Sequence, residues 1–150
     1  MGLKERLKGK KVYLDSNIFI YILEGFPQYE ALVNELIEGI ENNQFYCFSS
    51  ELTLAELLVP AFREENSAII SQYKHILNDP AFVKLIPTTQ DIYIYSASNR
   101  AHHNLKLPDA IHVATAQLSK YDVFLTNDKK IKAPKSIEVI ILDNLIDKSC

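Results

Sequence analysis

The stretch LPDAIHVATAQLSKYDVFLTND, residues 107–128, places a helix and a strand in direct succession. Pro108 suits the first turn of a helix, and the weakly charged run behind it predicts a buried helix that extends to Ser119. The apolar run 123–125 predicts a buried strand, which the three polar residues 126–128 end. A buried helix followed at once by a buried strand indicates an α/β fold.

The same alternation of short apolar runs and longer helical patterns extends over the whole chain. Strands are predicted at 11–15, 45–48, 82–86, 123–125 and 137–142, and helices at 18–23, 27–42, 51–64 with a kink at Pro60, 67–77, 89–104 and 108–119. This alternation predicts a mainly parallel, five-stranded sheet with helices on both faces. Because no Ser-, Gly- or Pro-rich linker divides the chain, we expect residues 1–150 to form a single domain.

The composition is that of an ordinary globular protein, which excludes disordered and coiled-coil chains. Among 150 residues, 47% are hydrophobic and 23% are charged, and 16 Lys and Arg against 19 Asp and Glu leave a net charge of −3. This balance excludes a broad, purely electrostatic nucleic-acid binder. Local basic segments remain at residues 1–11 and at Lys129, Lys130, Lys132 and Lys135. The second segment could contact an RNA backbone, or it could be a solvated loop.

The cysteine content and the hydropathy pattern indicate a cytoplasmic protein without a membrane segment. Cys47 and Cys150 make neither a disulfide framework nor a zinc-binding pattern, which favours a reducing compartment. No apolar run approaches the roughly 18 residues of a membrane helix. The apolar stretch 12–23 is interrupted at Asp15, so it lacks the continuous hydrophobic region of a signal peptide.

Four acidic residues occupy positions at which a parallel sheet would bring them together. Asp15 and Asp128 follow the first and fourth predicted strands. Asp109 lies in the first turn of a buried helix, and Glu56 is the only charge within 52–59. Each alone has an ordinary explanation, namely a helix cap, a turn, a favourable helix dipole or a side chain that tilts to solvent. In a parallel sheet, however, ligands bind beyond the carboxyl ends of the strands, where all four acids can converge.

A cluster of four carboxylates needs protons or cations, because like charges at close range repel each other. The helix neighbours of Glu56, Leu52, Ala55 and Val59, predict an apolar face on which an unpaired carboxylate is costly. The four acids lie too far apart in the sequence for a local loop site such as an EF-hand. Oxygen-only ligands suit Mg²⁺ or Mn²⁺, which activate water and stabilise charge on a phosphoryl group.

Four motifs, in order along nearly the whole chain, resemble those of a known family. They are VYLDSN at 12–17, LAEL at 54–57, LPDAIHVATA at 107–116 and LTND at 125–128. Together they resemble the PIN-domain ribonucleases, especially the VapC-type toxins of bacterial and archaeal toxin–antitoxin pairs. The resemblance implies a three-layer α/β/α sandwich around a parallel sheet. It also implies Mg²⁺- or Mn²⁺-dependent endonuclease activity on RNA that leaves 5′-phosphate and 3′-hydroxyl ends.

The resemblance further implies roles for individual residues. Four acids match the family's metal-site positions, three core acids and a more variable fourth: Asp15, Glu56, Asp109 and Asp128. Three polar residues accompany these acids within the motifs, at positions expected to support the site through hydrogen bonds: Asn17, Thr126 and Asn127. His112 lies three residues after Asp109 on the same helix face, which favours a supporting or packing role over metal ligation.

Protein partners and alternative functions also follow from the resemblance. A toxin would have a cognate antitoxin, and homodimers are common in the family. The helices within 27–42 and 51–78 could form an antitoxin groove or a dimer face, or could pack as ordinary amphipathic helices. Two alternative functions are compatible with the same fold. The chain could be a solitary PIN nuclease in RNA processing, or a catalytically inactive PIN-like module that binds proteins. The four intact acids favour the enzyme.

Two unrelated enzyme classes fit the sequence less well. A haloacid-dehalogenase-like phosphatase also begins with a strand that ends in Asp, but it needs a second Asp where this chain has Asn17. A metal-free ribonuclease would need a histidine acid–base pair. The adjacent helical residues His102 and His103 point in different directions, so they do not form such a pair.

Overall fold

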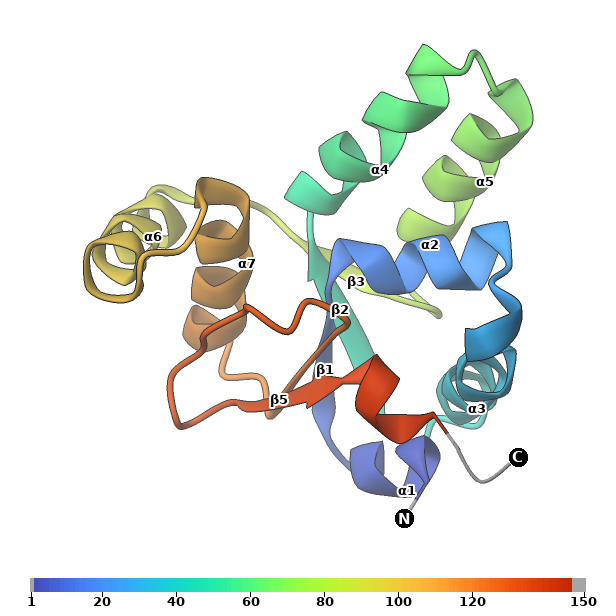
Figure 1. Cartoon of the computed structure of the whole chain (residues 1–150), viewed down its shortest axis with the longest axis horizontal. Coiled ribbons are helices and arrows are strands. Elements are labelled where there is room, and N and C mark those ends of the chain that lie inside the picture. The colour runs from blue at the N-terminus through green and yellow to red at the C-terminus, as the bar shows by residue number, and fades with distance from the viewer. Residues whose placement is uncertain (1, 147–150) are drawn as a thin grey trace.

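The computed structural model describes residues 2–146, so Met1 and residues 147–150, including Cys150, lie outside this description. One five-stranded sheet forms the centre of the molecule (Figure 1). Its strands are β1 Lys11–Leu14, β2 Tyr46–Ser50, β3 Lys84–Ile86, β4 Val123–Thr126 and β5 Glu138–Ile141. Every neighbouring pair is parallel, in the order β3-β2-β1-β4-β5. The predicted five-stranded parallel sheet is confirmed.

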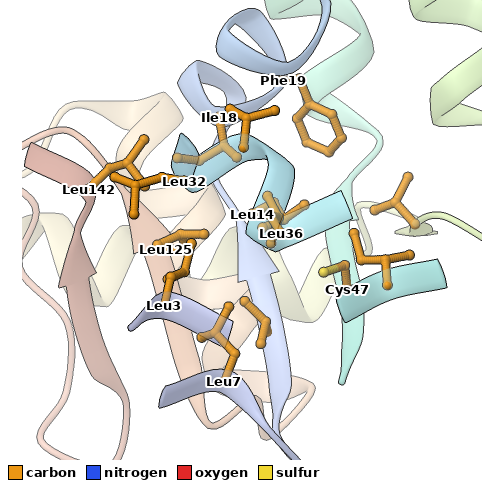
Figure 2. Packing of buried hydrophobic residues seen from close by; sticks show 14 of the residues in the cluster. Leu3, Leu7, Leu14, Ile18, Phe19, Leu32, Leu36, Cys47, Leu125 and Leu142 are labelled. Carbon is orange, nitrogen blue, oxygen red and sulfur yellow. The ribbon is translucent and has the colours of Figure 1, made fainter. Parts of the chain in front are cut away.

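Helices cover both faces of this sheet. The α-helices are α1 Leu3–Leu7, α2 Ser16–Glu24, α3 Glu30–Glu41, α4 Leu52–Arg63, α5 Ser67–Leu77, α6 Gln90–His103 and α7 Leu107–Leu118, and the 3₁₀-helices are η1 Pro27–Tyr29 and η2 Leu142–Leu145. Successive strand residues point to opposite faces. Val12 and Leu14 of β1 therefore join the core beneath α1, α2 and α3, part of which Figure 2 shows, whereas Tyr13 joins the core beneath α7. The three layers confirm the α/β/α sandwich.

The boundaries of several elements differ from the predicted ones by a few residues. The helix predicted over 27–42 is two helices, η1 and α3, which meet at Tyr29, the last residue of η1 and the N-cap of α3 (φ −107°, ψ 0°). The strand predicted from Phe82 begins only at Lys84. The backbone N–H groups of Phe82 and Val83 instead donate to the Asp79 carbonyl, in a turn that precedes the strand. Helix α4 remains helical on both sides of Pro60.

The short helix α1 has no counterpart in the sequence prediction. Leu3 and Leu7, one helical turn apart, are fully buried and anchor it to the core. Its basic residues point outward, where Lys4 pairs with Glu38 at 3.1 Å and Arg6 pairs with Glu138 at 2.8 Å. The basic segment at residues 1–11 therefore takes part in ion pairs within the fold. Within residues 2–146, no helix combines the length and the apolar character needed to cross a bilayer.

The order of the strands determines where a ligand would bind. From β1 the chain moves outward through β2 to β3, and it then returns to the other side of β1 for β4 and β5. The direction of this progression reverses between β1 and β4. In open parallel sheets, such a reversal opens a crevice beyond the carboxyl ends of the two strands. Asp15 and Asp128 lie at these two ends.

Candidate active site

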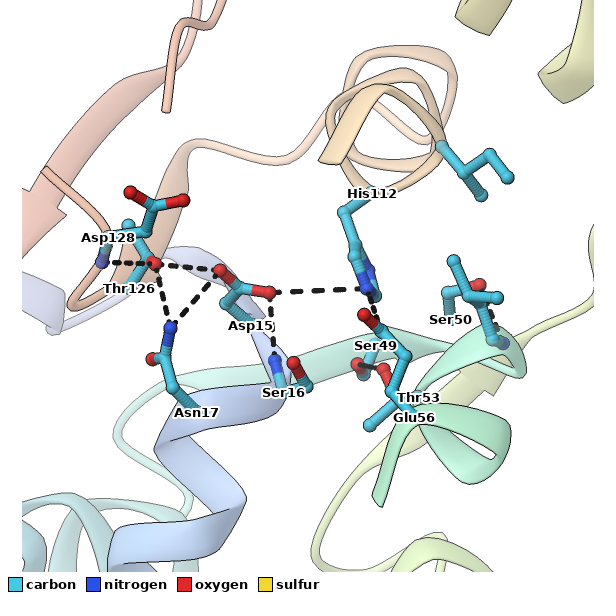
Figure 3. Close-up of polar contacts among 12 residues, drawn as sticks. Asp15, Ser16, Asn17, Ser49, Ser50, Thr53, Glu56, His112, Thr126 and Asp128 are labelled. Carbon is cyan, nitrogen blue, oxygen red and sulfur yellow. Dashed lines mark hydrogen bonds and ion pairs between the residues drawn. The ribbon is translucent and has the colours of Figure 1, made fainter. Parts of the chain in front are cut away.

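Asp15 is held at the carboxyl end of β1 by hydrogen bonds from three directions. It is the N-cap of α2, and its Oδ1 accepts a hydrogen bond from the Ser16 backbone N–H at 2.8 Å. Its Oδ2 accepts from the Thr126 hydroxyl at 2.7 Å and from the Asn17 amide at 3.4 Å (Figure 3). The residue is only 4% exposed. Asp15 can therefore cap α2 through Oδ1 while Oδ2 bonds to the residues of the site, because the two oxygens accept from different donors.

Asn17 and Thr126 also tie β1 to the segment after β4. The Asn17 amide contacts the Thr126 hydroxyl at 3.3 Å, and its oxygen accepts from the Asn127 backbone N–H at 3.1 Å. The backbone N–H of Asp128 donates to the Thr126 hydroxyl oxygen at 3.0 Å. Asn17 and Thr126 therefore hydrogen-bond to Asp15 and to each other, and their support of an active site stays a prediction.

Asn127 ties the segment after β4 to Tyr21, Tyr29 and Asp143. Its side-chain amide donates to the hydroxyl of Tyr29 at 2.8 Å and to that of Tyr21 at 3.1 Å. Its side-chain oxygen accepts from the backbone N–H of Asp143 at 2.8 Å. A hydrogen bond from Tyr29 to Asp143 raises the pKa of that tyrosine to about 12. The sequence does not point to Tyr29 or Asp143 as supporting residues, because nothing local to either residue indicates a contact with Asn127.

Glu56 reaches the site from α4 and contacts His112 of α7. The Nε2 atom of His112 lies against Oε1 of Glu56 and 4.0 Å from Oδ1 of Asp15 (Figure 3). The helix face that Glu56 shares with Leu52, Ala55 and Val59 is partly exposed, because Ala55 is exposed and Val59 is 46% exposed. The Glu56 side chain is itself 28% exposed, and α4 presents it at the rim of the site.

Asp109 interacts electrostatically with the other three acids. It lies in the first turn of α7, whose residues from Ala110 to Ala116 are buried. Partial burial raises the pKa of Asp109, and the negative charges of Asp15, Asp128 and Glu56 raise it further, whereas His112 opposes the shift. The tertiary structure therefore brings all four predicted acids close enough to interact, although they come from four separate elements.

The donor chemistry of this cluster fits a divalent cation. All four acids offer carboxylate oxygens, the ligands that Mg²⁺ and Mn²⁺ prefer, and the raised pKa of Asp109 indicates mutual repulsion that a cation would relieve. The side chains nevertheless do not converge on one point. Within residues 2–146, no three His, Cys, Asp or Glu side chains form a group that could hold a metal ion as they stand.

The predicted RNA-contact lysines lie on the loop that follows Asp128. Lys129, Lys130 and Lys132 are exposed. The ammonium group of Lys129 lies 3.9 Å from a carboxylate oxygen of Asp143, and the backbone N–H of Lys130 donates to Asp128 at 2.9 Å. The loop is thus joined to the site through its backbone, while these three side chains remain exposed.

Comparison with known proteins identifies the family. Residues 12–136 match the family model of the PIN domain. The chain belongs to the PIN-domain family. This assignment confirms the resemblance found in the sequence motifs and places the chain in a class of nucleases. A search of curated proteins finds no match.

Solved structures similar to this PIN domain include three from bacterial toxin–antitoxin systems. A toxin–antitoxin complex from Klebsiella pneumoniae matches with 25% identity and a TM-score of 0.63 over 84% of this chain and 94% of that one. VapBC2 from Rickettsia felis, bound to a promoter DNA fragment, matches with 17% identity and a TM-score of 0.67 over 87% and 98%. VapBC-5 from Mycobacterium tuberculosis matches with 21% identity and a TM-score of 0.59 over 88% and 98%.

Proposed function

We propose that this PIN domain is a metal-dependent endoribonuclease whose site comprises Asp15, Glu56, Asp109 and Asp128. The observation that carries the proposal is that contacts through His112 and Thr126 join Asp15, Glu56 and Asp128 at the carboxyl edge of the sheet. Asp109 lies close enough for burial and the charges of the other three acids to raise its pKa. The cluster of negative charges lies beyond β1 and β4, where the strand order reverses, and it favours binding of a cation over binding of a phosphate without a metal ion. Mg²⁺ or Mn²⁺ is the proposed cofactor, because the donors are oxygens.

The residues of the chain have separate tasks in the proposed hydrolysis. When bound, the divalent cation supplies Lewis acidity at the phosphate and lowers the pKa of water. Asp15 is held rigidly by the Thr126 hydroxyl and by Ser16, so it offers a fixed oxygen at the centre of the site. Asp109 and Asp128 bring the negative charge that binds the cation. The exposed side chains of Lys129, Lys130 and Lys132 are proposed to contact the RNA backbone.

A cleavage assay with a matched pair of variants tests this proposal. We expect purified protein to cut tRNA or rRNA with Mn²⁺ or Mg²⁺ and to stop when EDTA is added. Asp109→Asn should abolish cleavage while it leaves the circular dichroism spectrum unchanged. Asp91→Asn is the control, because Asp91 also lies in the first turn of a helix but is exposed and outside the site. Cleavage by Asp109→Asn, or cleavage in EDTA, would contradict the assignment.

We further propose that the protein is the toxin of a type II toxin–antitoxin pair in the cytoplasm. The structural neighbours from toxin–antitoxin systems support this role, and the buried free thiol of Cys47 agrees with a reducing compartment. The proposed partners are a cognate antitoxin and a second copy of the chain. Val59 and Phe62, 46% and 61% exposed on α4, offer apolar contact area beside the site.

Genetics and hydrodynamics test the partners separately. A small open reading frame beside the gene should encode a protein that copurifies with the chain and suppresses its cleavage of RNA. Light scattering of the chain alone should give the mass of a dimer. An active nuclease without such a neighbour would instead be the solitary RNA-processing enzyme. A chain that binds proteins but cleaves no RNA would be the inactive module.

A further inference from the structure

Tyr13 is a fully buried tyrosine directly beneath the carboxylate cluster. The alternation of β1 directs it to the sheet face opposite Val12 and Leu14, toward α7. Its ring stacks on Phe124 with a centroid distance of 5.0 Å and lies 5.8 Å from the ring of Tyr121. Contacts on several sides therefore fix the ring, and the hydroxyl has a defined position.

The hydroxyl of Tyr13 contacts one nitrogen of the His112 ring, and the carboxylate of Glu56 contacts the other. The Tyr13 oxygen lies 2.6 Å from Nδ1 of His112, and Nε2 of the same ring contacts Oε1 of Glu56. His112 is 1% exposed, so water does not compete for either nitrogen. The three side chains come from β1, α7 and α4, and they form a continuous path from the core to the site.

The two partners of His112 together favour one form of the neutral ring. A carboxylate only accepts hydrogen bonds, so the contact of Nε2 with Glu56 requires the proton to be on Nε2. Nδ1 is then free to accept a hydrogen bond from the hydroxyl of Tyr13. In the imidazolium form, Nε2 also carries a proton. In both forms Nε2 is a donor, so its lone pair is not available to a metal ion.

We propose that Tyr13 is a positioning residue of the nuclease site, which acts through His112 to hold the carboxylate of Glu56. The hydroxyl sets the orientation of the ring and keeps Nε2 directed at Glu56. His112 then restrains a side chain that α4 presents at the rim, where it would otherwise be free to turn toward solvent. The inference deepens the proposed nuclease function and rests on it for the role of Glu56.

The tautomer of His112 in metal-free protein is the first test, and it does not depend on activity. We would measure the ring nitrogen shifts of ¹⁵N-histidine-labelled protein by NMR, at a pH well above the pKa of His112. The resonance that is lost in His112→Gln assigns the residue. We expect the Nε2-protonated form in the wild type. An Nδ1-protonated ring would overturn the proposal, even if the variants described below failed to fold.

Tyr13→Phe, compared with Tyr121→Phe, is the second test. Both variants remove one hydroxyl from the same aromatic cluster, but only Tyr13 contacts His112. In Tyr13→Phe we expect a mixture of His112 tautomers and Mn²⁺ binding weakened by about tenfold, because outer partners of metal ligands typically contribute 10–100-fold. Tyr121→Phe should match the wild type in both measurements. Unchanged tautomer and unchanged Mn²⁺ affinity in Tyr13→Phe would overturn the proposal.

Kinetics separate this inference from the proposed function. With RNA as substrate, Tyr13→Phe should lower kcat by about tenfold and leave KM close to that of the wild type, because the buried Tyr13 touches no substrate. A rise in KM with unchanged kcat would overturn the positioning role. If the wild type itself cleaves no RNA, the nuclease assignment fails, while the tautomer and the Mn²⁺ titration still decide the role of Tyr13.

Discussion

The hydroxyl of Thr126, at the end of β4, donates a hydrogen bond of 2.7 Å to the carboxylate of Asp15, at the end of β1. Thr126 is fully buried and Asp15 is 4% exposed, so the bond satisfies a carboxylate that has little access to water. It also links the two strands between which the sheet changes direction. This single contact therefore joins the stability of the fold to the geometry of the proposed site.

Thr126→Val should destabilise the protein by about 1–3 kcal/mol, because it keeps the shape of the side chain and leaves a buried charged acceptor short of a donor. Urea denaturation measures this change. Thr126→Ser is the matched control, since it retains the hydroxyl, and it should lie closer to the wild type than Thr126→Val does. Destabilisation by Thr126→Ser as large as that by Thr126→Val would contradict this account, because Thr126→Ser loses only the methyl group and keeps the hydrogen bond.

Asp109→Asn should stabilise the metal-free protein while it abolishes cleavage. The pKa of Asp109 is raised by burial and by Asp15, Asp128 and Glu56, so its ionised form costs free energy in the folded state above that pKa. Removing the charge should therefore raise the free energy of unfolding at neutral pH. The gain should be below about 1 kcal/mol, because Asp109 is partly exposed and solvent screens the repulsion.

Mg²⁺ or Mn²⁺ should raise the Tm of the wild type, since a ligand that binds only the folded state stabilises it. We expect a much smaller rise in Asp109→Asn and an unchanged rise in Asp91→Asn, both measured by thermal unfolding in EDTA and in added metal. Equal metal-dependent shifts in all three proteins would place the cation outside the acidic cluster.

The ion pairs of Glu138 should contribute stability that is lost in acid. Hydrogen bonds from Arg6 and Lys10 hold the pKa of this carboxyl below its ordinary value. A lowered folded-state pKa gives stability that is present above the unfolded-state pKa and is lost as the pH falls through the folded-state pKa. Glu138→Gln should therefore lower stability at pH 7 by less than about 1 kcal/mol, because the carboxylate is 44% exposed. The difference from the wild type should vanish in acid, as urea melts at several pH values would show.

Gly39→Ala should destabilise the packing of α3 against the sheet. A Cβ atom at this position would lie 2.1 Å from the ring of Phe45, which is itself buried. Such overpacking typically costs about 1–3 kcal/mol. Phe45→Leu should also destabilise the protein on its own, but the double variant should be more stable than the sum of the two effects predicts. Strict additivity in urea denaturation would contradict the steric explanation.

The local elements were largely predictable because they depend on patterns within short stretches of chain. The helix over 67–77 and the helix of residues 108–119 follow from apolar spacing and proline placement, and both lie within a residue of the structure. Helix α1 escaped prediction, because a helix of five residues is too short to show a period and is held by the burial of Leu3 and Leu7. The sequence does not show how far the apolar face around Glu56 is covered, because the exposure of Ala55 and Val59 depends on how α4 packs in the tertiary structure.

By itself, the sequence determined the kind of fold, and it predicted that Asp15 and Asp128 lie near one edge of the sheet, because both follow parallel strands that end there. Only the tertiary structure decided which strands are neighbours and what holds each acid. The contact of Tyr13 with His112 spans 99 residues, and that of His112 with Glu56 spans 56. No pattern within a helix or a strand encodes such pairs. They arise because the core that packs α7 on β1 and the helix that follows β2 bring the three side chains to one place.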